Sequence, residues 1–579
     1  MINPFLAVPS ISLWKRGSFI QDSHSSPSSR NLTREGFRVW LRSKLTVWRG
    51  ALLVFLVVYC FALLINLGYM SIQWDEIPHL YGGLLLFRGQ TQNYLSVYGY
   101  YPPLYDLLTV GFYQAFGVNV AVGRSVAVIF SLLSVWITFE FANRMYGPKT
   151  GLIAAVLLGT MPGFFWVSRM TMIETMLVFF FSLSLLFFFS WIRSRNDKAL
   201  VLSGLAFGFG MLAKYQIVVA GIVMLVGIIF FFRGKIRPNL KKLLIVPIIA
   251  ILVVAPWFLV LAQSNPAAIG GYFYSVGVGG EDRSQYSTRF PLPVFYLVEM
   301  TWPFNDIPVH PISLPIYILG LLGLGVMAYR RKREDKFLLA WFLVVYVFFS
   351  LVPNKQWRYV TPLFPVLAVS AAGFILLVYS RLASFGRAKQ LSLRKLYLSK
   401  VAAAFFVVLA ASSIIYSGYN AYQMTARDQI HIPMEETANY IASHMSQNES
   451  AVIVGAFNLL NQDMLRFYLP ANMSPDQIWQ YPDLPVDAFT PNFNITEFVS
   501  LCEQRNVRYL VLYDFGANTP FFNTTMTYSN VTQLILDSGK FGYTGDEPFF
   551  GDELNYRTFL VGFRQAYNLE PLNNSSLGL

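Results

Sequence analysis

Charged side chains are scarce in this sequence. Asp, Glu, Lys and Arg make up only 13% of its 579 residues, whereas soluble domains carry roughly 25%. This scarcity argues against an ordinary soluble protein. Hydrophobic residues take the place of the missing charges, at 55% of the chain, and aromatic residues reach 17%. Apolar runs of about 20 residues recur, so the composition predicts a polytopic α-helical membrane protein.

Cysteine is also nearly absent. Cys60 lies inside the first apolar run and Cys502 near the C-terminus, so their settings differ too much for a disulfide framework to be expected. No cleavable signal peptide is expected either, because the first apolar run starts near Ala51 after a long polar lead. Residues 1–45 are rich in Ser and basic residues and predict a disordered cytoplasmic tail.

Acidic residues are fewer than basic ones, and the formal net charge is +13. This excess does not indicate a nucleic-acid partner, because the basic residues gather in alternate loops between the apolar runs. The runs within residues 46–420 predict about eleven membrane spans, at approximately 51–70, 120–142, 151–166, 171–191, 200–213, 217–232, 243–261, 312–329, 337–352, 359–380 and 401–419.

The distribution of Lys and Arg predicts the orientation of these spans. One set of loops carries 21 basic residues and the N-terminal tail adds eight, whereas the opposite loops carry seven. Because basic loops stay in the cytoplasm, the tail is expected inside the cell. A first outer loop at 71–117, a large outer loop at 263–310 and the C-terminal segment 421–579 are then expected outside.

The C-terminal segment alternates helix and strand patterns, which predicts a small soluble α/β domain. It is also rich in N-x-[ST] sequons, which suit an outward-facing surface that carries glycans, although chance can produce any single one. The candidate glycosylation sites are Asn448, Asn472, Asn494, Asn523, Asn530, Asn573 and Asn574. Sequons without disulfides favour the plasma membrane of an archaeon over that of a bacterium, with the endoplasmic reticulum membrane as the alternative.

Two adjacent carboxylates, Asp75 and Glu76, lie just beyond the first span. A carboxylate pair at a membrane surface can take a proton from a hydroxyl or hold a cation. The simpler alternative is a helix N-terminus, where acidic residues interact favourably with the helix dipole. The run from Ile77 to Arg88 predicts such a helix, lying along the membrane surface.

A group of cations shares this membrane face. Basic residues at membrane level are costly and need either a partner or a function. Those predicted at the outer ends of spans are Arg124, Arg169, Lys214, Lys355 and Arg358, together with the carboxylate Glu174. Such cations can hold a lipid phosphate, or they can simply anchor each span by snorkelling. Together with Asp75 and Glu76, they favour transfer of a group from a lipid phosphate to a hydroxyl.

Six short elements carry a family resemblance. They are Asp75-Glu76 with Tyr81 and Gly89, Tyr101-Pro102-Pro103-Leu104-Tyr105, Gly123-Arg124-Ser125, the stretch from Ser168 to Glu174, the stretch from Gly210 to Lys214, and the stretch from Lys355 to Tyr359 with Pro362 and Pro365. Their order and spacing over roughly residues 50–370 resemble the C-type, multi-span glycosyltransferases that use polyprenyl-phosphate sugars. The likeness is greatest to protein O-mannosyltransferases and lipid A aminoarabinose transferases. Tyr215 replaces the glycine that usually follows the lysine.

The resemblance implies direct, inverting transfer of a sugar at its anomeric carbon. Asp75 would be the general base toward the acceptor hydroxyl, while Glu76 and Glu174 would orient the site or coordinate a cation. The residues implied in donor-phosphate binding are Arg124, Lys214, Lys355 and Arg358. The implied donor is a polyprenyl- or dolichyl-phosphate sugar carrying mannose or another hexose or pentose. The acceptor hydroxyl would belong to a protein, a glycan or a lipid.

A divalent metal ion is a further hypothesis. Asp75 and His79 are spaced i, i+4 and can share one helix face, and Glu76 and His310 are additional candidate ligands. The alternative is a histidine that is hydrogen-bonded at the membrane surface.

Two other classes of function compete with a transferase. A transporter or flippase of lipid-linked or small polar substrates would show an inverted repeat with broken helices at the bilayer midplane. No such symmetry is visible, and the charges lie at the outer interface. An adhesion or scaffolding protein would work through its C-terminal domain, but the outward cations would then have no role.

The topology gives the first testable expectation. Cysteines introduced as Gln90→Cys and Gln462→Cys should both react with a membrane-impermeant thiol reagent added from outside, because both positions are placed on the outer side. Labelling of either cysteine only from the cytoplasm would contradict the eleven-span arrangement.

Overall fold

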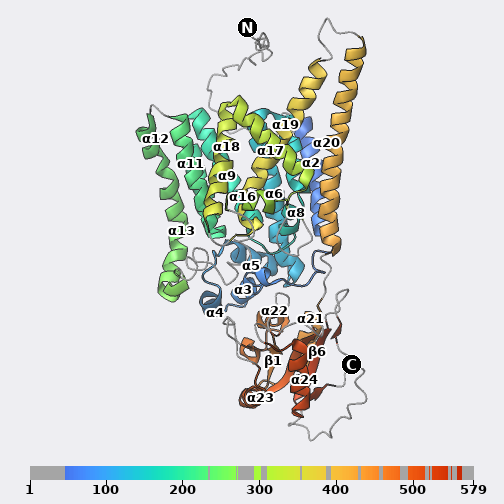
Figure 1. Ribbon diagram of the computed structural model, residues 1–579. Coiled ribbons are helices and arrows are strands. Elements are labelled where there is room, and N and C mark those ends of the chain that lie inside the picture. Colours follow the sequence, from blue (N-terminus) through green and yellow to red (C-terminus); the bar gives the residue numbers. More distant parts are fainter. Residues whose placement is uncertain are drawn as a thin grey trace, which may run out of the picture. The chain divides into compact units, whose positions relative to one another are not determined.

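A computed structural model of the chain describes residues 46–232, 235–268, 270, 292–301, 310–352, 355–385, 393–427, 432–455, 461–482, 493–514, 521, 525–544, 549–550 and 557–563. Residues 1–45, which are predicted to be a disordered cytoplasmic tail, lie outside the described residues. Among the described residues, helices dominate up to residue 427, and the remainder is mixed α/β (Figure 1).

Every apolar run of the sequence coincides with helical structure. The helices of this region are α2 (Val47–Leu64), α6 (Val120–Tyr146), α7 (Pro148–Thr160), α8 (Pro162–Val167), α9 (Glu174–Ser194), α10 (Lys198–Ala213), η2 (Tyr215–Ile217), α11 (Val218–Phe231), α12 (Ile236–Leu243), α13 (Ile245–Ser264), α16 (Leu292–Glu299), α17 (Leu314–Arg330), α18 (Arg333–Leu351), η4 (Trp357–Leu363), α19 (Phe364–Phe385) and α20 (Leu393–Arg427). In the described part of the chain, six helices are long and apolar enough to cross a membrane, and four apolar helices are shorter. The fold is therefore that of a multi-span membrane protein, and the number eleven stays a prediction.

Local sequence signals set the ends of these helices. The side chain of Asn119 caps α6 by accepting a hydrogen bond from the backbone N–H of Val122 at 2.9 Å. Gly147, with φ of 97°, ends the same helix, and Pro148 then begins α7. The chain therefore reverses between α6 and α7 without a loop, and the two helices pack against each other.

Burial separates central helices from peripheral ones (Figure 1). In α9, 78% of the most apolar 18-residue stretch is buried. The corresponding stretches are 17% buried in α2 and 22% buried in the part Tyr397–Gln423 of α20. Helix α9 packs against α6 and α10, and α10 packs in turn against α13. The central helix thus begins at Glu174, one of the predicted site residues.

Residues 71–117, which are predicted to be the first outer loop, fold into short helices. These are η1 (Trp74–Glu76), α3 (Ile77–Phe87), α4 (Thr91–Val97) and α5 (Leu104–Phe116). The helix predicted from Ile77 is present, and its place along a membrane surface stays a prediction. Nine of the eleven residues of α3 are buried, because α5 packs against it from one side and the C-terminal domain from another.

The C-terminal segment forms an α/β sheet structure. Its helices are α21 (Met434–His444), α22 (Gln462–Tyr468), η5 (Pro475–Gln477), α23 (Ile495–Gln504) and α24 (Tyr528–Asp537). Its strands are β1 (Ser450–Val454), β2 (Ile478–Tyr481), β3 (Val507–Asp514), β4 (Phe541–Tyr543), β5 (Phe549–Phe550) and β6 (Arg557–Phe563). The strand order is β2-β1-β3-β6-β4, and β5 also pairs with β6. Strands β1, β2 and β3 are parallel, and β6 is antiparallel to β3.

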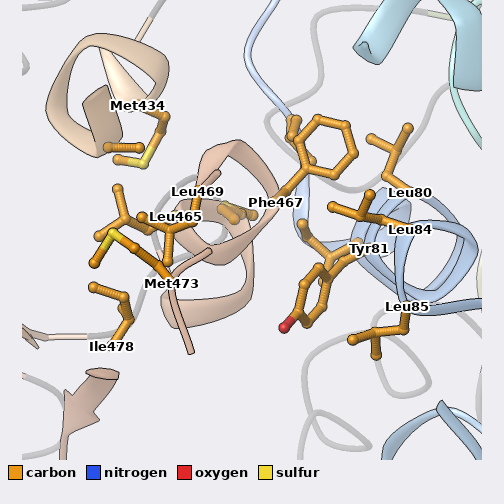
Figure 2. Packing of buried hydrophobic residues seen from close by; sticks show 14 of the residues in the cluster. Leu80, Tyr81, Leu84, Leu85, Met434, Leu465, Phe467, Leu469, Met473 and Ile478 are labelled. Atoms are coloured by element: carbon orange, nitrogen blue, oxygen red, sulfur yellow. The ribbon is translucent and has the colours of Figure 1, made fainter. Parts of the chain in front are cut away.

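One hydrophobic cluster joins this domain to the first outer loop. Figure 2 shows Phe467 of α22 beside Leu80 and Leu84 of α3, and all three side chains are buried; Tyr81 and Leu465 belong to the same cluster. The loop that carries the acidic pair and the C-terminal domain therefore share a core.

Candidate active site

Glu76 is fully buried and forms a salt bridge with Arg124. Its Oε2 accepts a hydrogen bond from Nη2 of Arg124 at 2.6 Å, and its Oε1 accepts one from Nε at 2.8 Å. The backbone N–H of Thr171 donates to Oε1 at 2.8 Å, and that of Gln73 donates to Oε2 at 3.1 Å. A buried carboxylate needs such partners to offset the loss of hydration. Both oxygens of Glu76 are therefore engaged in holding the fold.

All the N–H donors of Arg124 are used as well. In addition to its two bonds to Glu76, Nη1 donates to the carbonyl oxygens of Leu67 and Met70, both at 2.9 Å, and Nη2 to that of Ser71 at 3.2 Å. A guanidinium has five such donors, and Arg124 is 0% exposed. This arrangement argues against the predicted role of Arg124 in phosphate binding, because no donor is left for a phosphate. The residue instead ties the turn before the acidic pair to α6.

The glycine before Arg124 has a packing role. A Cβ atom added to Gly123 would lie 2.3 Å from Cδ2 of Leu80 in α3. The hydroxyl of Tyr105 donates to the Gly123 carbonyl oxygen at 3.1 Å. The Gly-Arg pair thus lets α6 approach the outer-loop helices closely and places the guanidinium beneath Glu76.

Asp75 faces the other way. Its side chain is 50% exposed, and its Oδ2 accepts a hydrogen bond from Nη2 of Arg358 at 2.8 Å. Nη1 of Arg358 lies 4.0 Å from Oε1 of Glu174, and that oxygen accepts a hydrogen bond from Nζ of Lys214 at 2.9 Å. Four predicted residues therefore form one row of alternating charge, although Asp75 and Arg358 are 283 positions apart.

Breaks in the helices present these side chains. Glu174 lies in the first turn of α9, where a negative charge is favoured by the helix dipole. Lys214 has an extended backbone, with φ −158° and ψ 125°, between α10 and η2. A Cβ added to Gly210 would lie 2.0 Å from Cδ1 of Ile217, so glycine allows this tight break. Arg358 lies on the 3₁₀ helix η4.

Tyr215 is accommodated at the position where the resembling family has glycine. Its hydroxyl accepts a hydrogen bond from Nε1 of Trp257 at 3.3 Å, and its ring centroid lies 6.0 Å from that of Phe258. Tyr215 therefore connects η2 to α13, and the backbone at Lys214 is still extended between α10 and η2.

Lys355 is a buried cation with 2% exposure. Its Nζ donates to the carbonyl oxygen of Val352 at 2.5 Å, and burial lowers the pKa of its ammonium group. Among the described residues, no carboxylate oxygen lies within 4.0 Å of this Nζ, so Lys355 forms no salt bridge there. Because an uncompensated buried charge is costly, Lys355 is suited to hold an anionic ligand.

His79 is engaged by a carboxylate. Its Nδ1 lies 2.7 Å from Oδ1 of Asp106, and the hydroxyl of Tyr94 donates to Oδ2 of Asp106 at 2.6 Å. This pairing favours the hydrogen-bonded alternative for His79. His310 contacts the carbonyl oxygen of Thr301. Over the described part of the chain, no three His, Cys, Asp or Glu side chains form a group that could hold a metal ion, so the ligand set expected there with Glu76, His79 and His310 is not assembled.

Asp106 is the residue that the sequence analysis missed. It is 0% exposed, and burial raises the pKa of its carboxyl group while the bonds from His79 and Tyr94 lower it. Through these bonds Asp106 joins α3, α4 and α5. The sequence signal for Asp106 was a single carboxylate within an otherwise apolar and aromatic stretch. Its partners Tyr94 and His79 are 12 and 27 positions away, and only the folded structure shows that they meet.

The remaining predicted residues lie outside this centre. Arg169 donates to the carbonyl oxygen of Leu63 at 2.7 Å, near the end of α2. The exposed sequon residues are Asn448, Asn472, Asn494 and Asn530. Asn523, Asn573, Asn574 and most of the predicted large outer loop 263–310 lie outside the described residues.

The Glu76–Arg124 pair allows a test of its structural role. Glu76→Gln removes one charge of the pair, and loss of one partner in a buried pair typically costs about 3–5 kcal/mol. We expect a lower melting temperature and lower yield of folded protein, measured by thermal unfolding in detergent.

The double variant Glu76→Gln/Arg124→Met should recover part of the lost stability, because it leaves no unpaired charge. Normal stability of the single variant would show that the pair does not hold this part of the fold.

Comparisons with known proteins bear on the family and the fold of this chain. Residues 101–259 match the family model described as dolichyl-phosphate-mannose-protein mannosyltransferase. An uncharacterized protein of Aquifex aeolicus is 25% identical over 281 residues, which cover 47% of this chain and 52% of that protein. The undecaprenyl phosphate-alpha-4-amino-4-deoxy-L-arabinose arabinosyl transferase of Edwardsiella ictaluri is 26% identical, over 43% of this chain and 45% of its own. The chain thus matches about half the length of these relatives.

Solved structures share the fold. ArnT from Cupriavidus metallidurans in the apo state has a TM-score of 0.60 at 15% identity, covering 89% of this chain and 98% of that one. The same protein has also been solved bound to undecaprenyl phosphate, with a TM-score of 0.59 at 14% identity and coverage of 90% and 99%. The Archaeoglobus fulgidus oligosaccharyltransferase in the apo form has a TM-score of 0.53 at 14% identity, covering 79% and 69%. The resemblance to C-type glycosyltransferases is therefore confirmed.

Proposed function

We propose that this relative of the C-type glycosyltransferases moves a sugar from a polyprenyl-phosphate carrier to an acceptor hydroxyl at the outer face of the membrane. The observation that carries the proposal is the row Asp75–Arg358–Glu174–Lys214, in which a half-exposed carboxylate touches a group of cations at the ends of membrane helices. The fold, and relatives that use a lipid-phosphate sugar, support the same reaction.

The charges suit a phosphate leaving group. The four residues of the row sum to zero formal charge, and Lys355 adds one positive charge that has no carboxylate partner among the described residues. A polyprenyl-phosphate sugar is a singly charged phosphodiester, and its phosphate gains negative charge as the bond to the sugar breaks. Cations that are already in place in a site without water stabilise this developing charge, because no side chain has to move during the reaction. We assign the phosphate to Lys214, Lys355 and Arg358, and we give Arg124 a structural role.

Asp75 is the general base in this proposal. It abstracts the proton of the acceptor hydroxyl while the acceptor oxygen bonds to the anomeric carbon. The bond from that carbon to the phosphate oxygen breaks, and the lipid phosphate departs with the electron pair. Asp75 suits this role because its side chain is half exposed, so an acceptor hydroxyl can approach its carboxylate. Glu174 orients the two cations beside it.

The matched family and the relatives name mannose and aminoarabinose as transferred sugars, so we propose a hexose or pentose of this kind. The acceptor is a hydroxyl of a protein, a glycan or a lipid. The cell location is the plasma membrane of a prokaryote, with an archaeal host and an outer C-terminal domain as proposals from the sequence.

The assignment of Asp75 predicts a selective loss of turnover. Asp75→Asn keeps the size of the side chain and removes the base, which should lower transfer by about 10²- to 10⁴-fold. Donor affinity should stay within a few-fold of normal, because the phosphate ligands are unchanged. The measurement is turnover with purified lipid-linked donor, with donor binding followed in parallel.

Asp476→Asn provides a matched control, since Asp476 is a carboxylate of the C-terminal domain outside the row. Near-normal turnover of a folded Asp75→Asn protein that binds donor would end the assignment.

The cations predict a loss of donor affinity. Lys355→Met, Lys214→Ala and Arg358→Ala should each weaken donor binding by roughly 1.5–3 kcal/mol, the usual contribution of a hydrogen bond to a charged group. Lys355→Met is the most direct test, because it orphans no carboxylate of the described chain. Lys242→Met is a control on a distant, half-exposed lysine. Unchanged donor binding in all three site variants would mean that these cations only anchor their helices.

The proposed reaction itself has a direct test. Mass spectrometry of membranes from a deletion strain should show a glycan shortened by one sugar, and purified protein should release polyprenyl phosphate only when an acceptor is present. The release of polyprenyl phosphate separates a transferase from a transporter or flippase, because neither of these breaks the bond between the sugar and the phosphate.

A further inference from the structure

The C-terminal domain touches the helix that follows the acidic pair. Figure 2 shows Phe467 of α22 between its own helix and Leu80 and Leu84 of α3. Helix α3 begins at Ile77, directly after Glu76, so a displacement of α3 would move the acidic pair. The apolar contact between α22 and α3 therefore lies next to the acidic pair and not at a remote part of the loop.

Polar contacts fix the same interface. The hydroxyl of Tyr98, at the end of α4, donates to Oδ2 of Asp463 in α22 at 2.5 Å. Burial raises the pKa of Tyr98 well above its usual value, so this hydroxyl stays protonated and remains a donor. Nη2 of Arg88, at the end of α3, donates to the carbonyl oxygen of Leu469 at 2.6 Å. These bonds are directional, and they set the orientation of α3 on α22.

A third contact reaches the acidic pair from its other side. The backbone N–H of Ile432 donates to Oγ of Ser71 at 2.5 Å. The carbonyl oxygen of Ser71 accepts from Arg124, and Arg124 binds Glu76, the neighbour of Asp75. The C-terminal domain is thus connected to Asp75 from both directions along the chain.

The donor cations have no such connection. Lys214 and Arg358 pair with Glu174 and Asp75, and Lys355 donates to Val352, so in the described residues their hydrogen bonds and ion pairs stay within the membrane part and the first outer loop. Arg358 donates to Asp75, so a change at the interface of the C-terminal domain should reach the phosphate ligands only through the base and should affect the base more strongly.

We infer that the C-terminal domain is a positioning part of the active site. Its segment Ile432 and helix α22 hold Ser71, α3 and Tyr98, and thereby keep Asp75 in line with the acceptor. Asp463, Phe467 and Tyr98 are positioning residues in this sense, since they act through α3 and do not touch the reacting atoms. The inference rests on the proposed function, because it assigns the domain to the geometry of that reaction.

The test uses the full-length protein with Tyr98→Phe and Phe467→Leu. Displacement of a base by about 1 Å can cost on the order of 10²-fold in rate, so we expect kcat to fall by roughly 10- to 10²-fold. KM and Kd for the lipid-linked donor should stay within about twofold of wild type. Hydrogen exchange of the amides of residues 71–78 should become faster in both variants.

Phe498→Leu is the matched control. Phe498 is fully buried in the second core of the same domain, away from α3. This variant should lower the stability of the domain but leave kcat and the exchange of residues 71–78 unchanged. Asp463→Asn keeps an acceptor for the Tyr98 hydroxyl and should retain most activity, whereas Asp463→Ala should behave like Tyr98→Phe.

Two results would overturn the inference. One is wild-type kcat and exchange in Tyr98→Phe and Phe467→Leu. The other is an equal loss of kcat in Phe498→Leu, which would indicate a general effect of domain stability. Failure of the proposed function looks different: wild-type protein would then transfer no sugar at all, while the exchange comparison would still report whether the domain holds residues 71–78.

Discussion

A buried ion pair organises the region around the acidic pair of this protein. Glu76 and Arg124 are both removed from water, so their mutual attraction and hydrogen bonds must offset a large loss of hydration. The pair meets this requirement by recruiting backbone groups from the turn before the acidic pair and from Thr171 before α9. Three segments distant in sequence are thereby fixed around one carboxylate, and the direction of Asp75 follows from it.

The two adjacent acids then divide their tasks. In the short 3₁₀ helix η1, neighbouring side chains point in different directions, and Glu76 turns into the fold while Asp75 turns toward water. An ionised carboxylate can serve as a base only where an acceptor can reach it, and Asp75 alone of the two meets this condition. Lys355 contributes the opposite property, a buried positive charge that a lipid phosphate would neutralise.

The C-terminal domain extends this arrangement beyond the membrane part. Helix α3 consists mainly of apolar residues, which are unfavourable in contact with water. Neighbouring elements bury nine of its eleven residues. The domain supplies part of that cover through α22 (Figure 2). A base carried on a loop is held more precisely when packing and directional hydrogen bonds support the loop from several sides. Both kinds of contact are present here.

Sequence alone determined the class of fold, because long apolar runs and basic loops follow from the physics of the bilayer and need no knowledge of partners. It also marked several charges that need a partner or a function, since a charge at membrane level is costly wherever it lies. Sequence did not determine how these charges pair. Arg124 and Arg358 are both arginines at outer ends of helices, yet one has all its donors occupied by Glu76 and backbone carbonyls and the other touches the exposed Asp75. The pairing of His79 with Asp106 and the contact of α22 with α3 were equally hidden. Only the tertiary structure decides such contacts, because they depend on which surfaces meet across hundreds of residues and not on the local pattern of the chain.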